Sequence, residues 1–325
     1  MKLATIGTSW ITEKFISSLK TVDGISLTAV YSRSKEKAEE FAKKHGTGYY
    51  YTDLTEMAES NCFDSVYIAS PNRFHYEQSK LFLQHGKNVI CEKPATTTKA
   101  QMEELYELAE EKGLIYCEAI MTIHTEGFRQ IKSYLSRLGI IRTSHFDFCQ
   151  LSSKYPQYLN GDNPNIFNPL MHTGCLMDIG VYNLYLCAAL YGMPEKIISD
   201  SVMLPNNCDA SGSAILKYDT HTVVLNYSKT GQTYSYSEII GDKGTLLFSS
   251  VSQLTGLSFR NKENEIQLIP EEVSRDEIMS GEIRFFIKMC EEKCYSSEDY
   301  SFTKNTALTI REICDIIRQQ NNFEF

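Results

Sequence analysis

The chain has 325 residues, of which 42% are hydrophobic and 22% are charged. This composition is typical of a folded globular protein and excludes extensive disorder, and the length predicts two domains of roughly 150 residues each. The net charge of −9 argues against nucleic acid or an anionic membrane as the main partner.

Features that report on the cellular compartment favour the cytoplasm. The segment Met1–Ile6 has the pattern of a strand and not of a signal peptide, and no apolar run approaches the roughly 20 residues of a membrane span. The 10 cysteines predict free thiols. Cys290 and Cys294 share a helix face, but no nearby His or Cys completes a zinc site, so we expect no metal.

The first strand-like run, Leu3–Ile6, is followed by a glycine turn and a helical pattern through Leu19. This order is typical of a dinucleotide-binding unit, in which backbone N–H groups and the helix N-terminus receive a pyrophosphate. Only Gly7 remains of the three fingerprint glycines, and an ordinary tight turn is the alternative. The residues expected to contact the dinucleotide here are Gly7, Thr8, Ser9, Trp10 and Ile11.

A second strand-like run, Ile25–Tyr31, ends at Ser32 and Arg33, and an amphipathic helical pattern follows. Proteins selective for NAD usually place an acidic residue at this point to bind the ribose 2′-hydroxyl. A hydroxyl and a guanidinium suit a 2′-phosphate instead, because arginine pairs with phosphate through two hydrogen bonds. The pair favours NADP(H) and leaves NAD(H) open. The alternative is that Ser32 caps the helix and Arg33 is solvated.

Strand and helix patterns continue to alternate, with strands expected at 64–69, 88–91 and 114–117. Such alternation predicts a doubly wound parallel sheet of Rossmann type. The strand 88–91 leads directly into Glu92–Lys93–Pro94 at the carboxyl edge of the sheet, where ligands bind. Lys93 is therefore a candidate for chemistry, with a solvated charged loop as the alternative. The proline fixes the turn, and a cis peptide is one way to do so.

After residue 121 the sequence changes character. The segment 152–172 is rich in Pro, Asn and Tyr and has little periodicity. Long irregular segments are uncommon in compact domains unless they cover a ligand site, so this one is interpreted as an active-site lid or a subunit contact. A helical pattern over 173–191 then carries Asp178 and Tyr182 on one face.

The other elements expected in this half predict a mostly antiparallel sheet flanked by helices, because hairpin-type residues separate the strand-like runs. The expected strands are 141–151, 196–203, 212–218, 222–228, 234–240 and 245–248, and the expected helices are 125–138, 282–290 and 305–318.

Five motifs stand in order along the chain: Ser70–Asn72 with His75, Gly86–Pro94, Glu118–Met121, Gly174–Tyr182 and Ile240–Thr245. Together they resemble the Gfo/Idh/MocA family of oxidoreductases, which includes glucose-fructose oxidoreductase, inositol dehydrogenase and dihydrodiol dehydrogenase. The sequence departs from the family in its single fingerprint glycine, Gly7, and in His172–Cys175, where many members carry a glycine run.

The resemblance implies an NAD(P)-dependent dehydrogenase or reductase with an α/β fold. Residues 1–120 form the Rossmann domain, onto which the C-terminal helix packs back. Residues 121–325 form an α+β domain that binds substrate and mediates a homodimer or homotetramer through its open sheet. The resemblance also implies cofactor contacts at Ser70, Pro71, Asn72, His75, Glu92, Lys93 and Met121.

Hydride transfer at a secondary alcohol requires that a proton leave or join the oxygen. Tyr182 is the candidate for this step, although an unperturbed tyrosine has a pKa of about 10. An ammonium group nearby lowers such a pKa, and Lys93 is the candidate ammonium. Asp178, one helical turn before Tyr182, orients the lysine or binds the substrate. The family resemblance supports the same three residues, and packing of Tyr182 or a dipole role for Asp178 is the alternative.

The sequence therefore predicts an oxidoreductase that acts on a small polyhydroxy substrate: a sugar, a sugar derivative, an inositol or a dihydrodiol. His172 and Tyr155 are expected to contact it. A rival interpretation is a non-catalytic dinucleotide sensor of the same fold, although a sensor has no need of a proton donor. A reductase of a planar, non-sugar substrate is a third, since Tyr155, Tyr158 and Phe167 supply aromatic surface.

Overall fold

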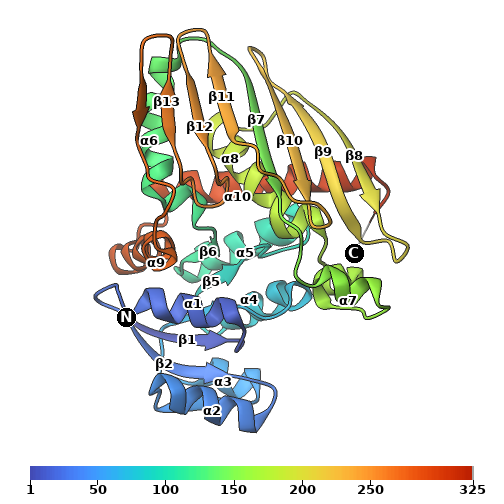
Figure 1. Cartoon of the computed structure of the whole chain (residues 1–325). Coiled ribbons are helices and arrows are strands. Elements are labelled where there is room, and N and C mark those ends of the chain that lie inside the picture. Colours follow the sequence, from blue (N-terminus) through green and yellow to red (C-terminus); the bar gives the residue numbers. More distant parts are fainter. Residues whose placement is uncertain (324–325) are drawn as a thin grey trace. The chain divides into compact units, whose positions relative to one another are not determined.

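The computed structural model describes residues 1–323 and divides the chain into two compact units. The first unit contains Met1–Ile120 and Ser274–Leu308, and the second contains residues 121–273 and 309–323. Each unit has its own sheet (Figure 1). The C-terminal portion of the chain therefore contributes to both units.

The first unit is built on a parallel sheet, which confirms the predicted Rossmann-type fold. Within the described residues the sheet has 6 strands in the order β3-β2-β1-β4-β5-β6. The strands are β1 (Lys2–Ile6), β2 (Ser26–Tyr31), β3 (Tyr49–Tyr51), β4 (Ser65–Ile68), β5 (Asn88–Glu92) and β6 (Tyr116–Ala119). The helices of the unit are α1 (Trp10–Leu19), α2 (Lys35–His45), α3 (Leu54–Glu59), α4 (His75–Gln84), α5 (Lys99–Lys112) and α9 (Arg275–Glu292).

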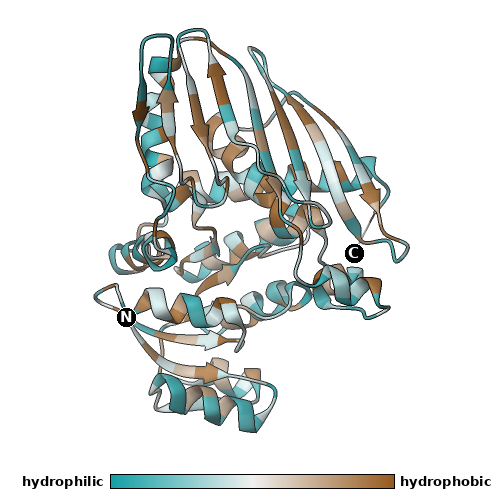
Figure 2. Cartoon of the chain, in the orientation of Figure 1, coloured by the Kyte–Doolittle hydropathy of each residue, from teal (hydrophilic) through white to brown (hydrophobic). Residues whose placement is uncertain are grey.

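Local sequence signals account for the ends of these helices. Asp53 and Thr98 accept hydrogen bonds from backbone N–H groups in the first turns of α3 and α5, as N-cap residues do. Helices α2 and α5 end at Gly46 and Gly113, both in the left-handed conformation that glycine adopts without strain. The polar outer face of α2 is coloured teal in Figure 2, while buried stretches of the sheet strands are brown.

Helix α9 returns to the first unit and packs on α1. Asp276 accepts hydrogen bonds from Ser17 Oγ at 2.9 Å and from Ser18 Oγ at 3.2 Å. Helix α10 (Glu298–Gln320) begins in this unit, where Tyr300 Oη donates to the carbonyl of Tyr116 at 3.0 Å. The sheet edge at β6 is thus held by a residue far away in the sequence.

The second unit contains the mostly antiparallel sheet that the sequence predicts. In the part of the chain that the structure describes, it has 8 strands in the order β14-β13-β12-β11-β7-β10-β9-β8. Strands β7 and β10 pair in parallel and the other neighbours are antiparallel. The strands are β7 (Ile141–Cys149), β8 (Lys196–Met203), β9 (Asp209–Lys217), β10 (Thr222–Ser228), β11 (Ser237–Gly241), β12 (Thr245–Phe248), β13 (Ser258–Arg260) and β14 (Glu265–Gln267).

Three helices accompany this sheet: α6 (Glu126–Tyr134), α7 (Tyr155–Leu159) and α8 (Val181–Tyr191). The predicted helix over 173–191 proves to be composite, because a one-turn π-helix, Leu176–Gly180, precedes α8. The short strands β13 and β14 were not predicted, since three residues carry no readable periodicity.

One sequence expectation on apolar length needs correction. Among residues 1–323, the segment Pro169–Tyr191 is long and apolar enough to cross a membrane, with a mean hydropathy of 1.3. The most apolar window of this segment is 89% buried inside the protein. The segment is therefore a core helix of the second unit, as in a soluble protein.

Candidate active site

A pocket of about 680 Å³ lies at the carboxyl ends of β1, β2 and β4 in the first unit. It is lined by Ile6, Gly7, Thr8, Ser9, Tyr31, Ser32, Arg33, Ser34, Lys37, Leu54, Ala69, Ser70, Pro71, Phe74 and Gln78. This is the edge of an open α/β sheet at which ligands bind. Of the predicted cofactor residues, Gly7, Thr8, Ser9, Ser32, Arg33, Ser70 and Pro71 line the pocket.

Gly7 shows that the backbone at this turn is shaped for close approach. Its φ is +109°, and a Cβ at this position would lie 2.5 Å from the carbonyl oxygen of Ala69. No other residue fits this conformation and this space. Ser9 then precedes α1, whose first backbone N–H groups are available to an anion. One glycine is therefore sufficient for the tight turn that the usual fingerprint makes with three.

The second part of the pocket is cationic. Ser32, Arg33, Ser34 and Lys37 line it, and none of the lining residues, all within the described range, is acidic. The cap of α2 is Ser34, whose Oγ accepts from the backbone N–H of Lys37 at 3.3 Å. The alternative that Ser32 caps this helix is therefore wrong. Ser34 and Lys37 were not predicted as pocket residues. Their positions just after Arg33, at the start of α2, could have indicated that they line the same pocket.

Other predicted cofactor residues do not line this pocket. Trp10 is 60% exposed and lies 4.9 Å from the guanidinium of Arg275. The remaining predicted residues outside the lining are Ile11, Asn72, His75, Glu92, Lys93 and Met121. Nothing in the geometry of the first unit alone assigns these a cofactor contact.

His75 has a structural place in this unit. It is buried, and its ring nitrogens lie 2.9 Å from the carbonyl oxygen of Pro94 and 2.6 Å from that of Ser70. Burial lowers the pKa of His75. The ring thus connects the turn that contains Ser70 to the turn that contains Lys93.

The turn that presents Lys93 is held from several sides. The Lys93–Pro94 peptide is cis, as the sequence suggested. Glu92 is buried and accepts a hydrogen bond from Tyr67 Oη at 2.5 Å, and burial raises the pKa of Glu92. Glu118 accepts from the backbone N–H of Ala95 at 2.7 Å. These contacts fix the backbone on both sides of Lys93 at the end of β5.

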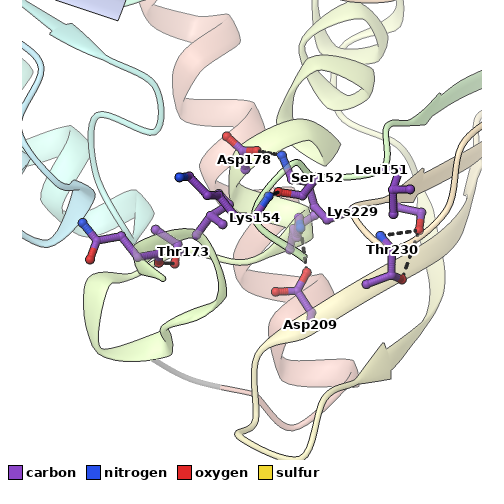
Figure 3. Close-up of polar contacts among 12 residues, drawn as sticks. Leu151, Ser152, Lys154, Thr173, Asp178, Asp209, Lys229 and Thr230 are labelled. Carbon is purple, nitrogen blue, oxygen red and sulfur yellow. Dashed lines mark hydrogen bonds and ion pairs between the residues drawn. The ribbon is translucent and has the colours of Figure 1, made fainter. Parts of the chain in front are cut away.

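Asp178 and Tyr182 lie in the second unit, on the π-helix and the first turn of α8. The Tyr182 ring packs against Phe148 of β7, with centroids 5.7 Å apart. Lys229, directly after β10, donates from Nζ to Asp178 Oδ2 at 2.5 Å (Figure 3). Lys229 was not predicted from the sequence, because only the pairing of β10 with β7 brings it to this helical segment.

The start of this helical segment is fixed by a buried carboxylate. Asp209 Oδ2 accepts from the backbone N–H of Leu176 at 2.6 Å. A Cβ on Gly174 would lie 1.8 Å from Asp209 Oδ1, so glycine is required at that point. Burial raises the pKa of Asp209 from 3.8 to about 6. The carboxylate holds the π-helix, and with it Asp178, against β9.

The two predicted substrate residues lie in the segment 152–172, which forms short helical turns. Tyr155 begins α7 and its ring lies 5.8 Å from that of Phe167. His172 has a φ of 53° and follows the 3₁₀ turn Pro169–Met171. Among the described residues, no group of three His, Cys, Asp or Glu side chains is placed to hold a metal ion.

Comparisons with known proteins agree with this architecture. Residues 1–119 match the family described as "Oxidoreductase family, NAD-binding Rossmann fold", and residues 128–247 match the "GFO/IDH/MocA C-terminal domain". The scyllo-inositol 2-dehydrogenase (NADP(+)) IolU of Bacillus subtilis is 37% identical over 322 residues, which cover 98% of this chain and 97% of that protein. The chain belongs to the GFO/IDH/MocA family.

Other relatives extend the comparison. The uncharacterised oxidoreductase YgjR of Escherichia coli is 35% identical over 96% of this chain and 95% of its own. The 3-ketoreductase KijD10 of Actinomadura kijaniata, solved with NADP and TDP-benzene, superposes with a TM-score of 0.86 at 22% identity and covers 99% of this chain and 98% of its own. This GFO/IDH/MocA member is thus an NAD(P)-dependent oxidoreductase that acts on CH–OH groups, as the sequence predicts.

Proposed function

We propose that this oxidoreductase uses NADP(H) and acts on a hydroxyl or carbonyl carbon of a small polyhydroxy substrate: a sugar, a sugar derivative, an inositol or a dihydrodiol. The observation that carries the cofactor preference is the pocket end formed by Ser32, Arg33 and Lys37, which lacks a carboxylate among its described lining residues. A 2′-phosphate gains charge-assisted hydrogen bonds there. The bound NADP of KijD10 and the name of IolU support the preference.

The cofactor fits the residues that are present. Gly7 leaves space where a side chain would meet the carbonyl of Ala69, so a pyrophosphate can approach the backbone at the N-terminus of α1. Arg33 and Lys37 supply two positive charges at the other part of the same pocket. When bound, the nicotinamide supplies or accepts the hydride.

The chain's own residues handle the proton. We assign this proton transfer to Tyr182 Oη. A tyrosine hydroxyl can exchange a proton with the substrate oxygen, and Tyr182 is buried, so little water competes for that proton. By the family resemblance we assign to Lys93 the role of the ammonium that favours an ionised tyrosine, and to Asp178 the role of acceptor for a substrate hydroxyl. The family resemblance and the ordered turn around Lys93 support these roles.

The names of two relatives support the proposed substrate class. IolU is named for scyllo-inositol, and 24% identity over 266 residues relates the chain to trans-1,2-dihydrobenzene-1,2-diol dehydrogenase of Xenopus tropicalis. Both named substrates are cyclic and carry adjacent hydroxyls. His172 and Tyr155, both in the segment 152–172, are proposed as further substrate contacts in the second unit.

The proposal extends to the roles of the two halves of the chain. Residues 1–120 bind the dinucleotide, and residues 121–325 bind substrate and assemble a cytoplasmic homodimer or homotetramer. Three apolar side chains support the assembly, because they are exposed on one face of the neighbouring strands β8 and β9: Ile198 (52%), Val202 (63%) and Ile215 (44%). Sedimentation of the purified protein tests it, and a monomer at micromolar concentration contradicts it.

The test of the function is reduction of NADP⁺ or NAD⁺, followed by the absorbance of the reduced nicotinamide. The panel begins with scyllo-inositol and includes other inositols, sugars and trans-dihydrodiols. We expect turnover of at least one member, with kcat/KM for NADP⁺ exceeding that for NAD⁺ by about tenfold or more, as expected for a charged hydrogen bond. If no substrate in the panel is turned over and NADPH still binds tightly, the result would favour the non-catalytic sensor.

A further inference from the structure

The ammonium of Lys229 forms a partly buried ion pair with Asp178. The Nζ–Oδ2 distance is 2.5 Å, and the side chains are 10% exposed for the lysine and 23% exposed for the aspartate. The aspartate is therefore the more exposed member of the pair. In Figure 3 the two side chains point toward each other from different elements.

The backbone around Lys229 is fixed as firmly as its side chain. Its N–H donates to the carbonyl of Ala210 at 2.9 Å, and its carbonyl accepts from the N–H of Ser152 at 2.9 Å. Lys229 therefore connects the start of β9, the end of β10 and the beginning of the segment 152–172. Its side chain is 10% exposed, so the ammonium is largely shielded from solvent.

Stability of the fold does not by itself require this pair. Removing two charges from water costs several kcal/mol per ion, and apolar residues of similar volume usually hold a fold at least as well. Asp178 precedes Tyr182 on one continuous helical segment and its side chain is 23% exposed, which instead suits a binding role for the pair. A fixed, ionised carboxylate is a strong acceptor for a hydroxyl donor.

We propose that Lys229 is a positioning residue that keeps Asp178 ionised and oriented to accept a hydrogen bond from a hydroxyl of the substrate. The proposal rests on the proposed function and deepens it, because such an acceptor selects a substrate with a second hydroxyl beside the reacting carbon. A ketone or alcohol without that neighbouring hydroxyl gains nothing from the pair.

The first test compares Lys229→Met with Lys229→Arg, using Lys217→Met on the exposed face of β9 as a control for loss of one positive charge. Lys229→Met should lower kcat/KM for the polyhydroxy substrate by about a hundredfold, as misplacement of a binding group does. Lys229→Arg should restore most of it, and the Kd for NADPH should stay unchanged in all three.

A double-mutant cycle separates positioning from an independent role. If Lys229 acts through Asp178, then Lys229→Met adds little to the defect of Asp178→Asn. Defects that multiply, or a Lys229→Met enzyme as active as Lys217→Met, would overturn the proposal while leaving the dehydrogenase function standing.

A second measurement needs no substrate. The Asp178 carboxyl can be followed by ¹³C NMR in protein labelled at aspartate and assigned with Asp178→Asn. Because an ammonium favours the ionised carboxyl, its removal in Lys229→Met should move the titration midpoint of Asp178 to higher pH. Asp209 and Cys175 also interact electrostatically with this carboxyl, and both are unchanged in the variant. An unchanged titration midpoint of Asp178 would contradict the proposal even if no substrate in the panel were turned over.

Discussion

The dinucleotide pocket and the surroundings of Asp178 are assembled in different ways. In the first unit, residues that follow β1, β2 and β4 directly in the sequence line one pocket, because the carboxyl ends of parallel strands meet at one edge. In the second unit, Asp209 and Lys229 come from distant parts of the chain and reach the helical segment that carries Asp178 only through the pairing of β9, β10 and β7. The first kind of site is readable from local motifs, and the second depends on strand register.

In the dinucleotide pocket, this difference predicts that cofactor affinity depends strongly on the backbone conformation of the Gly7 turn. Gly7→Ala places a Cβ 2.5 Å from the Ala69 carbonyl oxygen, at a φ of +109° that alanine tolerates poorly. We expect the Kd for NADPH to rise about tenfold or more, since each 1.4 kcal/mol of strain corresponds to a factor of ten.

Gly48→Ala is the matched control for this substitution, because a Cβ there meets no atom within 4 Å. Fluorescence titration with NADPH measures both variants. Equal affinity of the two would show that the Gly7 turn does not receive the pyrophosphate.

The charge in the same pocket should act on one cofactor only. Arg33→Ala removes a guanidinium that can pair with a 2′-phosphate, so the Kd for NADPH should rise by roughly tenfold to a hundredfold, as for a charged hydrogen bond. NADH affinity should stay nearly constant. Lys35→Ala, on the exposed surface of α2, is the control. An equal loss for both cofactors would contradict the 2′-phosphate assignment.

In the second region, the buried carboxylate of Asp209 predicts a dependence of stability on pH. Its folded pKa of about 6 lies above the ordinary 3.8, so the folded state holds the proton more tightly than the unfolded state. The wild type therefore loses about 3 kcal/mol of stability as the pH rises from 4 to above 6, at 1.36 kcal/mol per pKa unit.

Asp209→Asn removes this titration. The melting temperature of the wild type, measured relative to that of the variant, should fall between pH 4.5 and pH 7.5. A difference that stays constant across this range would show that Asp209 does not hold a proton when folded.

Much of the architecture could be predicted because it depends on local pattern. The alternation of strands and helices predicted the parallel sheet of the first unit. Ser32 and Arg33 predicted the cationic part of the pocket at its edge. Lys37 was not predicted as a pocket residue, because a lysine on an amphipathic helix is usually solvated. Asp178 was found from its spacing to Tyr182, whereas its partner Lys229 was not.

What was missed has a common physical cause. Ser228 pairs with Cys149 in the parallel ladder between β10 and β7, and that register places the next residue, Lys229, beside the π-helix. Register is set by packing across the whole sheet, so no window of sequence contains it. The π-helix itself is a local irregularity of a kind that often marks functional sites, and nothing in the sequence pattern predicts it.

The role of Tyr182 in proton transfer is tested by comparing Tyr182→Phe with Tyr185→Phe, which changes a buried tyrosine on the same helix. Steady-state turnover of NADP⁺ with the best substrate of the panel, and NADPH binding, are measured for both. We expect Tyr182→Phe to lose about 10²–10⁴-fold in kcat, the usual contribution of a proton-transfer group, with NADPH affinity intact and with Tyr185→Phe close to wild type. Full turnover by Tyr182→Phe would contradict the assignment of the proton to this residue.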